Sequence, residues 1–136
     1  MADAPELTLR RALAGLLHAN GLAVYAPTGA LPALGVKLDG EFPTIDEFTT
    51  IASPPTTADG FSDNVVYRVQ FYTRRKGSPN VAEKWASDLE KLLNRKEYTP
   101  NILGISWAWE MSRTYFDKDT QGRVAVAATY GFRGRR

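Results

Sequence analysis

The first apolar pattern along the chain has the spacing of an amphipathic helix. Between about Pro5 and Asn20, apolar side chains recur at intervals of three and four residues, at Leu9, Ala12, Leu13, Leu16 and Leu17. This spacing places them on one helical stripe. Gly21 follows, and glycine readily adopts the left-handed backbone that often ends a helix. We therefore expect a helix over roughly residues 5–20 with one buried face.

The next clear pattern is a long period-two alternation. From Asn64 to Arg74 the side chains alternate so that one face carries Val65, Tyr67, Val69, Phe71 and Thr73. Such alternation predicts a strand with one core face and one wetter face. Residues 22–25 and 48–52 are weaker strand candidates, separated by a connection that contains several prolines and glycines.

A second amphipathic helix is expected shortly after residue 77. Its apolar stripe consists of Val81, Trp85, Leu89 and Leu92. Two starts fit the sequence equally well. Asn80 with Glu83 resembles a capping box, and Ser78 followed by Pro79 places a proline at the first helical position.

The last third of the chain predicts a long antiparallel hairpin, because two alternating runs flank a turn of Asp and Gly residues at 117–122. We expect one hydrophobic face to lie under the helices, formed by Ile105, Trp107, Trp109, Met111, Val124, Val126, Ala128, Tyr130 and Phe132. The core is favoured over a platform for nucleic-acid bases, since such platforms interleave exposed aromatic side chains with Lys or Arg. The opposite face is small and flat, either approached by another protomer or solvated, and consists of Ala108, Ala125, Ala127, Thr129 and Gly131.

Together these elements predict an α+β fold with a largely antiparallel, mixed sheet of four to five strands. Two helices are expected to pack on one face, and the long hairpin is expected to end the chain. With 136 residues and no linker or repeat, the chain is expected to form one domain over residues 1–136. The segment 53–64 opposes both helix and strand pairing, which indicates a functional arm or a mobile loop.

Composition narrows the function without naming it. The chain has no cysteine, which excludes disulfides, zinc–thiolate sites and thiol nucleophiles. The formal net charge of +2 is too small to imply nucleic acid unless the basic residues cluster. Neither a signal peptide nor an apolar run of about 20 residues is evident, so we expect no membrane association.

Three candidate chemical sites have simpler interpretations. Asp117 and Asp119 begin a pattern similar to a calcium loop, but the twelfth position is Ala128 where a Glu ligand is required, so we expect a hairpin turn. His18 is the only histidine and lies on the polar face of the first helix. Glu110 has no obvious second carboxylate, which favours an ion-pair partner over an acid or base. We expect no catalytic site, metal site or cofactor, and therefore no enzyme.

The basic residues form two clusters at strand ends, 74–76 and 133–136. These clusters could track a phosphate backbone, or they could be solvated ends or the salt-bridging edge of an interface. Together with residues of the 53–64 loop, they are the candidate assembly interface or lumen residues: Pro54, Pro55, Phe61, Arg74, Arg75, Lys76, Arg133, Arg135 and Arg136.

The order of elements and several weak motifs resemble the tail terminator proteins of long-tailed phages, often labelled minor capsid proteins. The resemblance extends from about Glu6 to Phe132. It includes Val69-Gln70-Phe71-x-x-Arg74, the helix with Trp85 and Leu89, and the turn Asp119-x-x-Gly122-Arg123. The chain departs from the family pattern at residues 77–79, where an acidic residue usually precedes the proline, and at Gln121, where Asn is commoner.

The resemblance implies a small subunit of a homohexameric ring at the head-proximal end of the phage tail. Such a ring stops addition of the major tail tube protein and offers a joining surface to the neck and head–tail connector proteins. Its location would be the virion, after synthesis in the host cytoplasm, and DNA would only pass through its lumen. The 53–64 loop and the basic clusters would be contact or lumen elements, and the flat hairpin face or a sheet edge would join neighbours.

Other functions remain open from the sequence. A neck or head-completion protein would also be small and oligomeric. A small DNA-binding module would use the arginine clusters, and its binding would depend on salt. A hydrolase or nuclease would depend on Glu110, Asp117 or Asp119.

Overall fold

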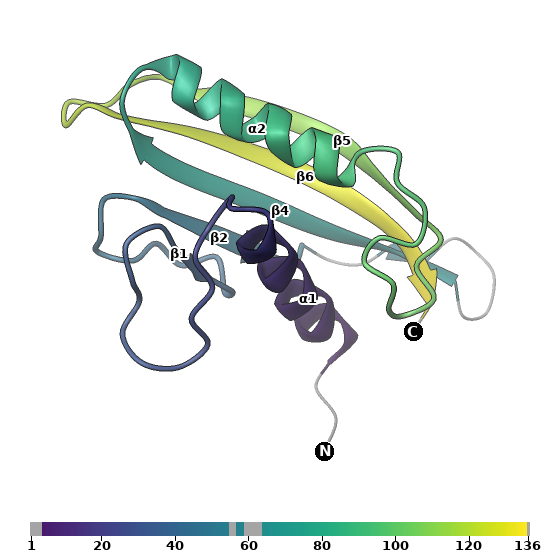
Figure 1. The fold of residues 1–136 in the computed structure, drawn as a ribbon. Coiled ribbons are helices and arrows are strands. Elements are labelled where there is room, and N and C mark those ends of the chain that lie inside the picture. Colours follow the sequence, from purple (N-terminus) through teal and green to yellow (C-terminus); the bar gives the residue numbers. More distant parts are fainter. Residues whose placement is uncertain (1–3, 55–56, 59–63, 136) are drawn as a thin grey trace.

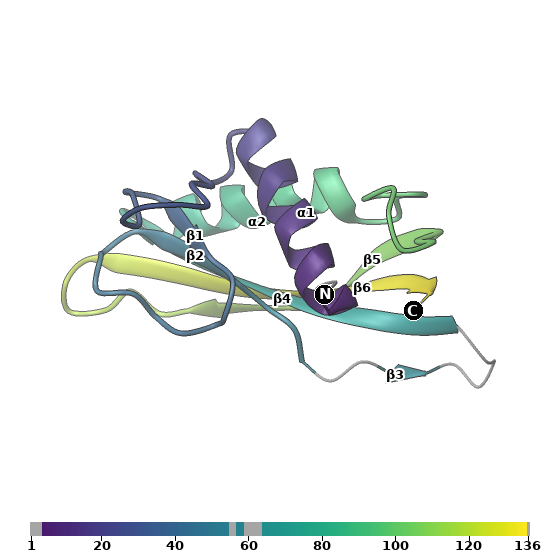
Figure 2. The same cartoon turned by 90° about the horizontal axis from the view of Figure 1, so that it is seen from below.

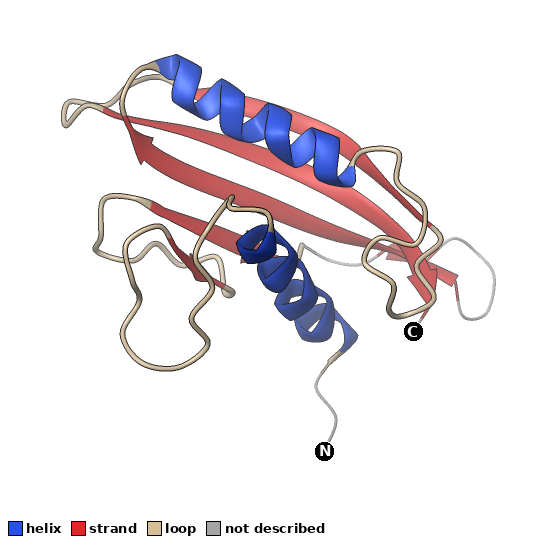
Figure 3. Ribbon diagram, viewed as in Figure 1, coloured by secondary structure: helices blue, strands red, loops and turns tan. Residues whose placement is uncertain are grey.

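The computed structural model describes residues 4–54, 57–58 and 64–135. Its elements are, in chain order, α1 (Pro5–Ala19), β1 (Gly35–Lys37), β2 (Phe48–Ala52), β3 (Thr57–Ala58), β4 (Asn64–Lys76), α2 (Pro79–Leu93), β5 (Trp107–Phe116) and β6 (Arg123–Arg135). Figure 3 shows helices, strands and loops in separate colours. Among the described residues, no helix has the length and apolar content needed to cross a membrane.

The strands form one mixed sheet in the order β1-β2-β4-β6-β5, with the two-residue β3 paired to the start of β4. β1 and β2 are parallel, and the other pairs are antiparallel. β4 and β6 form the centre of the sheet and pair along their whole length, from Asn64 with Arg135 to Lys76 with Arg123. The predicted α+β class with a largely antiparallel, mixed sheet is confirmed.

Both helices lie on the same side of the sheet in Figure 2. α1 buries Leu9, Leu13, Ala14 and Leu17, and α2 buries Ala82, Trp85, Ala86, Leu89 and Leu93. The N-cap of α2 is Ser78 with Pro79 following, so the second of the two predicted starts is the one adopted. Trp85 Nε1 donates to the Leu22 carbonyl at 2.8 Å, which ties α2 to the chain just after α1.

The helices cover the face of β4 and β6 that the alternation predicts. Fully buried residues there include Val69, Phe71, Val126, Tyr130 and Phe132. The rings of Phe71 and Tyr130 meet edge to face at 5.7 Å between centroids, a favoured aromatic geometry. The core therefore lies between the two helices and the central strands.

On β5 the predicted core face is wrong. Ala108 is fully buried opposite Phe132, whereas Trp107 and Trp109 stand opposite Arg133 and Gly131, on the side of the sheet away from the helices. A β-bulge between Glu110 and Ser112 then shifts the alternation by one residue. The physical reason is that β5 is apolar on both faces at its start, so period two alone does not say which face is buried.

Two weaker strand predictions also change. Residues 22–25 form no strand, and Val24 makes only a single parallel bridge with Gly35, where the unpredicted β1 begins. Within the 53–64 loop, Thr57 and Ala58 do pair with β4, although the composition of the loop opposed any strand. At Thr57 and Ala58, pairing with the long strand β4 has overridden the weak local preference.

Candidate assembly surface

The described candidate residues do not form one surface. Arg74, Arg75 and Lys76 end β4, whereas Arg133 and Arg135 end β6. Because β4 and β6 are antiparallel and paired end to end, the two basic clusters lie at opposite ends of the sheet, roughly 30 Å apart at ~3.3 Å per strand residue. Pro54 follows β2 and is half-buried. Pro55, Phe61 and Arg136 lie outside the described residues.

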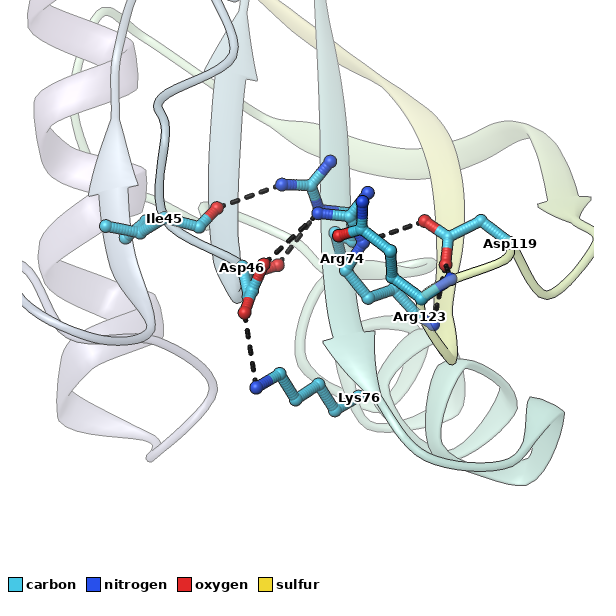
Figure 4. Close-up of polar contacts among 7 residues, drawn as sticks. Ile45, Asp46, Arg74, Lys76, Asp119 and Arg123 are labelled. Atoms are coloured by element: carbon cyan, nitrogen blue, oxygen red, sulfur yellow. Dashed lines mark hydrogen bonds and ion pairs between the residues drawn. The ribbon is translucent and has the colours of Figure 1, made fainter.

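The first cluster is held by intramolecular contacts (Figure 4). Arg74 donates to the carbonyls of Ile45 and Asp46, each at 2.9 Å. Lys76 Nζ lies 3.2 Å from the Asp46 carboxylate, and Arg123 Nη1 lies 3.2 Å from the other carboxylate oxygen. We call Asp46, Arg74, Lys76, Asp119 and Arg123 the Asp46 cluster. It fastens the loop before β2 to the adjoining ends of β4 and β6.

Asp119 organises the turn between β5 and β6. Its Oδ1 accepts the amide protons of Gln121 and Arg123, each at 2.9 Å, and its Oδ2 accepts Arg123 Nε at 2.7 Å. The predicted hairpin turn is therefore confirmed. These bonds, led by the Arg123 amide, hold the pKa of Asp119 below its ordinary value, and Lys76 does the same for the pKa of Asp46.

Arg75 points to the helix side of the sheet and is buried, with 8% of its surface exposed. Its guanidinium donates to the carbonyls of Phe48, Arg74 and Leu22 at 3.0 to 3.1 Å. Burial lowers the pKa of Arg75 to about 10, an effect that the charge of Glu47 partly opposes. This arginine connects β2, β4 and the segment after α1, and it does not form part of an outer surface.

Glu110 is the carboxylate for which we predicted an ion-pair role, and that role is confirmed. Its Oε2 accepts the Tyr130 hydroxyl at 3.0 Å and Arg113 Nη2 at 2.8 Å, while Arg113 also pairs with Glu90 of α2. Burial, followed by the charge of Glu110, raises the pKa of Tyr130 above its ordinary value. The group links β5, β6 and α2.

The clearest candidate for an assembly contact is the half-open edge of β5. Near the start of the strand, Lys96 exchanges two backbone hydrogen bonds with Ala108, and Asn94 Oδ1 accepts the Glu110 amide. Beyond the bulge, no other described segment pairs with the outer side of 111–116. Met111, Tyr115 and Phe116 are 41%, 45% and 48% exposed there. We call residues 111–116 the open edge.

Comparison of the chain with protein-family models and with curated proteins gives no match.

Sequence reasoning named a sheet edge as a possible contact without locating it at residues 111–116, and it missed the Asp46 cluster. The adjacent aromatic residues Tyr115 and Phe116 were a signal for the open edge, since in a strand they point to opposite faces and one of them has to lie outside the core. Asp46 carried no such signal, because its partners Lys76 and Arg123 are distant in the chain.

Proposed function

We propose that the protein is a structural virion-assembly subunit, a tail terminator without enzymatic activity. Copies of the chain would form a homohexameric ring on the head-proximal end of the tail tube. The ring would stop polymerisation of the major tail tube protein and present a joining surface to the neck and head–tail connector proteins. DNA would only pass through its lumen.

The observation that carries this proposal is the open edge of β5. In an antiparallel pair, successive residues turn their backbone groups alternately toward and away from the partner strand. Ala108 turns its groups outward to Lys96, and the register beyond the bulge turns those of Arg113 and Tyr115 outward as well. Unpaired backbone groups beside exposed apolar side chains favour pairing with another chain.

The two edges of the sheet differ, which favours a ring. β5 is long and half-open, whereas β1 has three residues and is already bridged to Val24 on its outer side. A contact between β5 and any other surface of the next copy is heterologous, and heterologous contacts close into rings when the rotation between copies allows it. The resemblance to tail terminators supports the same assembly.

The experiment compares two substitutions at one position. Tyr115→Pro removes the outward amide that pairs with a neighbour, and proline is tolerated at an edge strand where that amide faces solvent. Tyr115→Ala removes the same side chain but keeps the amide, so it serves as the matched control. Each protein is incubated with purified tail tubes and imaged by negative-stain electron microscopy.

We expect six-fold rings on one end of each tube with the unsubstituted protein and with Tyr115→Ala, and uncapped tubes with Tyr115→Pro. Circular dichroism and thermal unfolding check that the proline variant is folded. Uncapped tubes with the unsubstituted protein would reject termination. Normal capping by a folded Tyr115→Pro variant would reject the open edge as the contact.

A further inference from the structure

The sheet face away from the helices, which we call the open face, carries only basic charge at its strand positions. The register places on this face Lys37, Arg68, Arg74, Lys76, Arg123, Arg133 and Arg135, and no acidic residue occupies a position on it in the described strands. At the end of the sheet next to the β5–β6 turn, Asp46 and Asp119 from the adjoining loops form ion pairs with Lys76 and Arg123. At the other end, no described carboxylate pairs with Arg68 or Arg135.

The end of the sheet at Arg133 and Arg135 contains a polar cavity of about 240 Å³. Its lining consists of Asn64, Gly104, Ser106, Arg133, Gly134 and Arg135. The two arginines stand on a fixed backbone, because Arg133 O accepts the Ser106 amide at 2.9 Å and the Arg135 amide donates to Leu103 O at 2.7 Å. Guanidinium groups held beside an amide and a hydroxyl suit the oxygens of a phosphate group.

Two tryptophans of β5 lie on the same sheet face as Arg133 and Arg135. Trp107 stands directly opposite Arg133 in the register, and Trp109 stands opposite Gly131. A methyl group placed on Gly131 would lie 2.7 to 3.0 Å from three atoms of the Trp109 ring, so the ring lies over the glycine. The absence of a side chain at 131 therefore lets a large ring lie against the sheet, with Arg68 on the neighbouring strand opposite the same glycine.

We propose that this end of the open face binds single-stranded nucleic acid. Arg133 and Arg135 hold backbone phosphates at the cavity, and bases stack on Trp109 and Trp107. Interleaved aromatic and arginine side chains on a sheet are the usual means of holding unpaired bases. An isologous contact with a second copy of the chain is disfavoured at this face, since it would bring the same basic charge against it. The inference uses different residues from the open edge and does not depend on ring formation.

The test measures fluorescence anisotropy of a labelled thymidine oligonucleotide at several salt concentrations. One variant combines Arg133→Gln with Arg135→Gln, and a second is Trp109→Ala. The matched control combines Lys84→Gln with Lys91→Gln, which removes the same charge from α2 on the other side of the sheet. A duplex of the same length and an inorganic polyphosphate are competitors, and thermal unfolding verifies that each variant is folded.

We expect the double arginine variant to bind at least tenfold more weakly and to lose about 1.4 from the slope of log K against log salt, the value for two phosphate contacts to a single strand. Trp109→Ala should weaken binding about tenfold through lost stacking. The lysine control should change binding by less than about twofold.

Four results would overturn the inference. They are no binding of the oligonucleotide at about 50 mM salt, equal weakening by the lysine control, unchanged binding by a folded Trp109→Ala variant, or competition by duplex or polyphosphate as effective as that by the single strand. Each of these results would leave the ring proposal unaffected, because that proposal rests on residues 111–116.

Discussion

Glu110 joins the Tyr130 hydroxyl and the Arg113 guanidinium at the margin of the sheet. The side chains of Glu110 and Arg113 are 20% and 18% exposed, so water only partly screens their contact. Hydrogen bonds to charged groups in such surroundings stabilise more than neutral ones. A residue that sequence alone marks as a solitary carboxylate thus acts as a connector of three elements.

Replacing Glu110 with Gln should lower the free energy of unfolding by about 2 kcal/mol, because the buried hydroxyl and the guanidinium lose their charged acceptor. Urea denaturation of the variant gives this value from the transition midpoint. Glu83→Gln, on the exposed side of α2, is the matched control and should leave the midpoint nearly unchanged. An unaltered midpoint in Glu110→Gln would contradict the structural role assigned to this carboxylate.

The element most dependent on polar contacts is the loop before β2. The Asp46 cluster attaches this loop to β4 and β6, and the Phe42 ring stacks on Tyr72 at 4.5 Å between centroids. The loop thereby covers Phe48, which is fully buried although it lies on the open face of the sheet. Ion pairs at exposed positions contribute little individually, so the loop depends on several of them acting with the aromatic contact.

Lowering the pH should weaken the attachment of the loop before β2 to β4 and β6. The pKa values of Asp46 and Asp119 are lower in the folded protein than the ordinary 3.8, so the unfolded chain binds more protons as the pH falls through this range. The stabilisation is present above the ordinary pKa and is lost below it. We expect the Tm to fall between about pH 6 and pH 3, and to fall less in Asp46→Asn.

Thermal unfolding at the two pH values checks this prediction. Asp117→Asn is the control, since it removes the same charge from the β5–β6 turn without removing a contact of the Asp46 cluster. If the Tm of Asp46→Asn and the Tm of the unsubstituted protein fell equally at low pH, Asp46 would not contribute to the acid sensitivity.

At the scale of the whole molecule, the sheet has one covered face and one closed edge. The two helices cover one face, and Val24 bridges β1 at the closed edge. The open edge and the basic, tryptophan-containing face are the two surfaces for which we propose partners. Because they use different residues, our two proposals are compatible: one subunit would contact a neighbouring copy through β5 and a nucleic acid through the face of β4, β5 and β6.

Amide hydrogen exchange should show the open edge directly. In the isolated subunit, the amides of Arg113 and Tyr115 should exchange rapidly, whereas those of Ser112 and Thr114, directed toward β6, should be protected. In assembled rings all four should be protected. Slow exchange at Arg113 and Tyr115 in the isolated subunit would show that this edge is already paired.

Local periodicity was sufficient to predict both helices, the long strand at 64–74, the turn around Asp119 and the buried face of β6. These features depend on residues two to four positions apart, which lie close together whatever the rest of the chain does. The α+β class follows from their order. The sequence also revealed the two basic clusters, but it did not predict that they lie at opposite ends of the sheet.

Contacts between segments that are distant in the chain determine the features that local periodicity did not predict. The pairing of β5 with β6, the bulge after Glu110 and the proximity of α2 together place Ala108 inside and both tryptophans outside. Only the strand order shows that β5 lies at an edge and that Asp46 meets Lys76 and Arg123. An alternating pattern specifies two faces of a strand, whereas the choice of buried face and free edge is made by the neighbours that the strand acquires on folding.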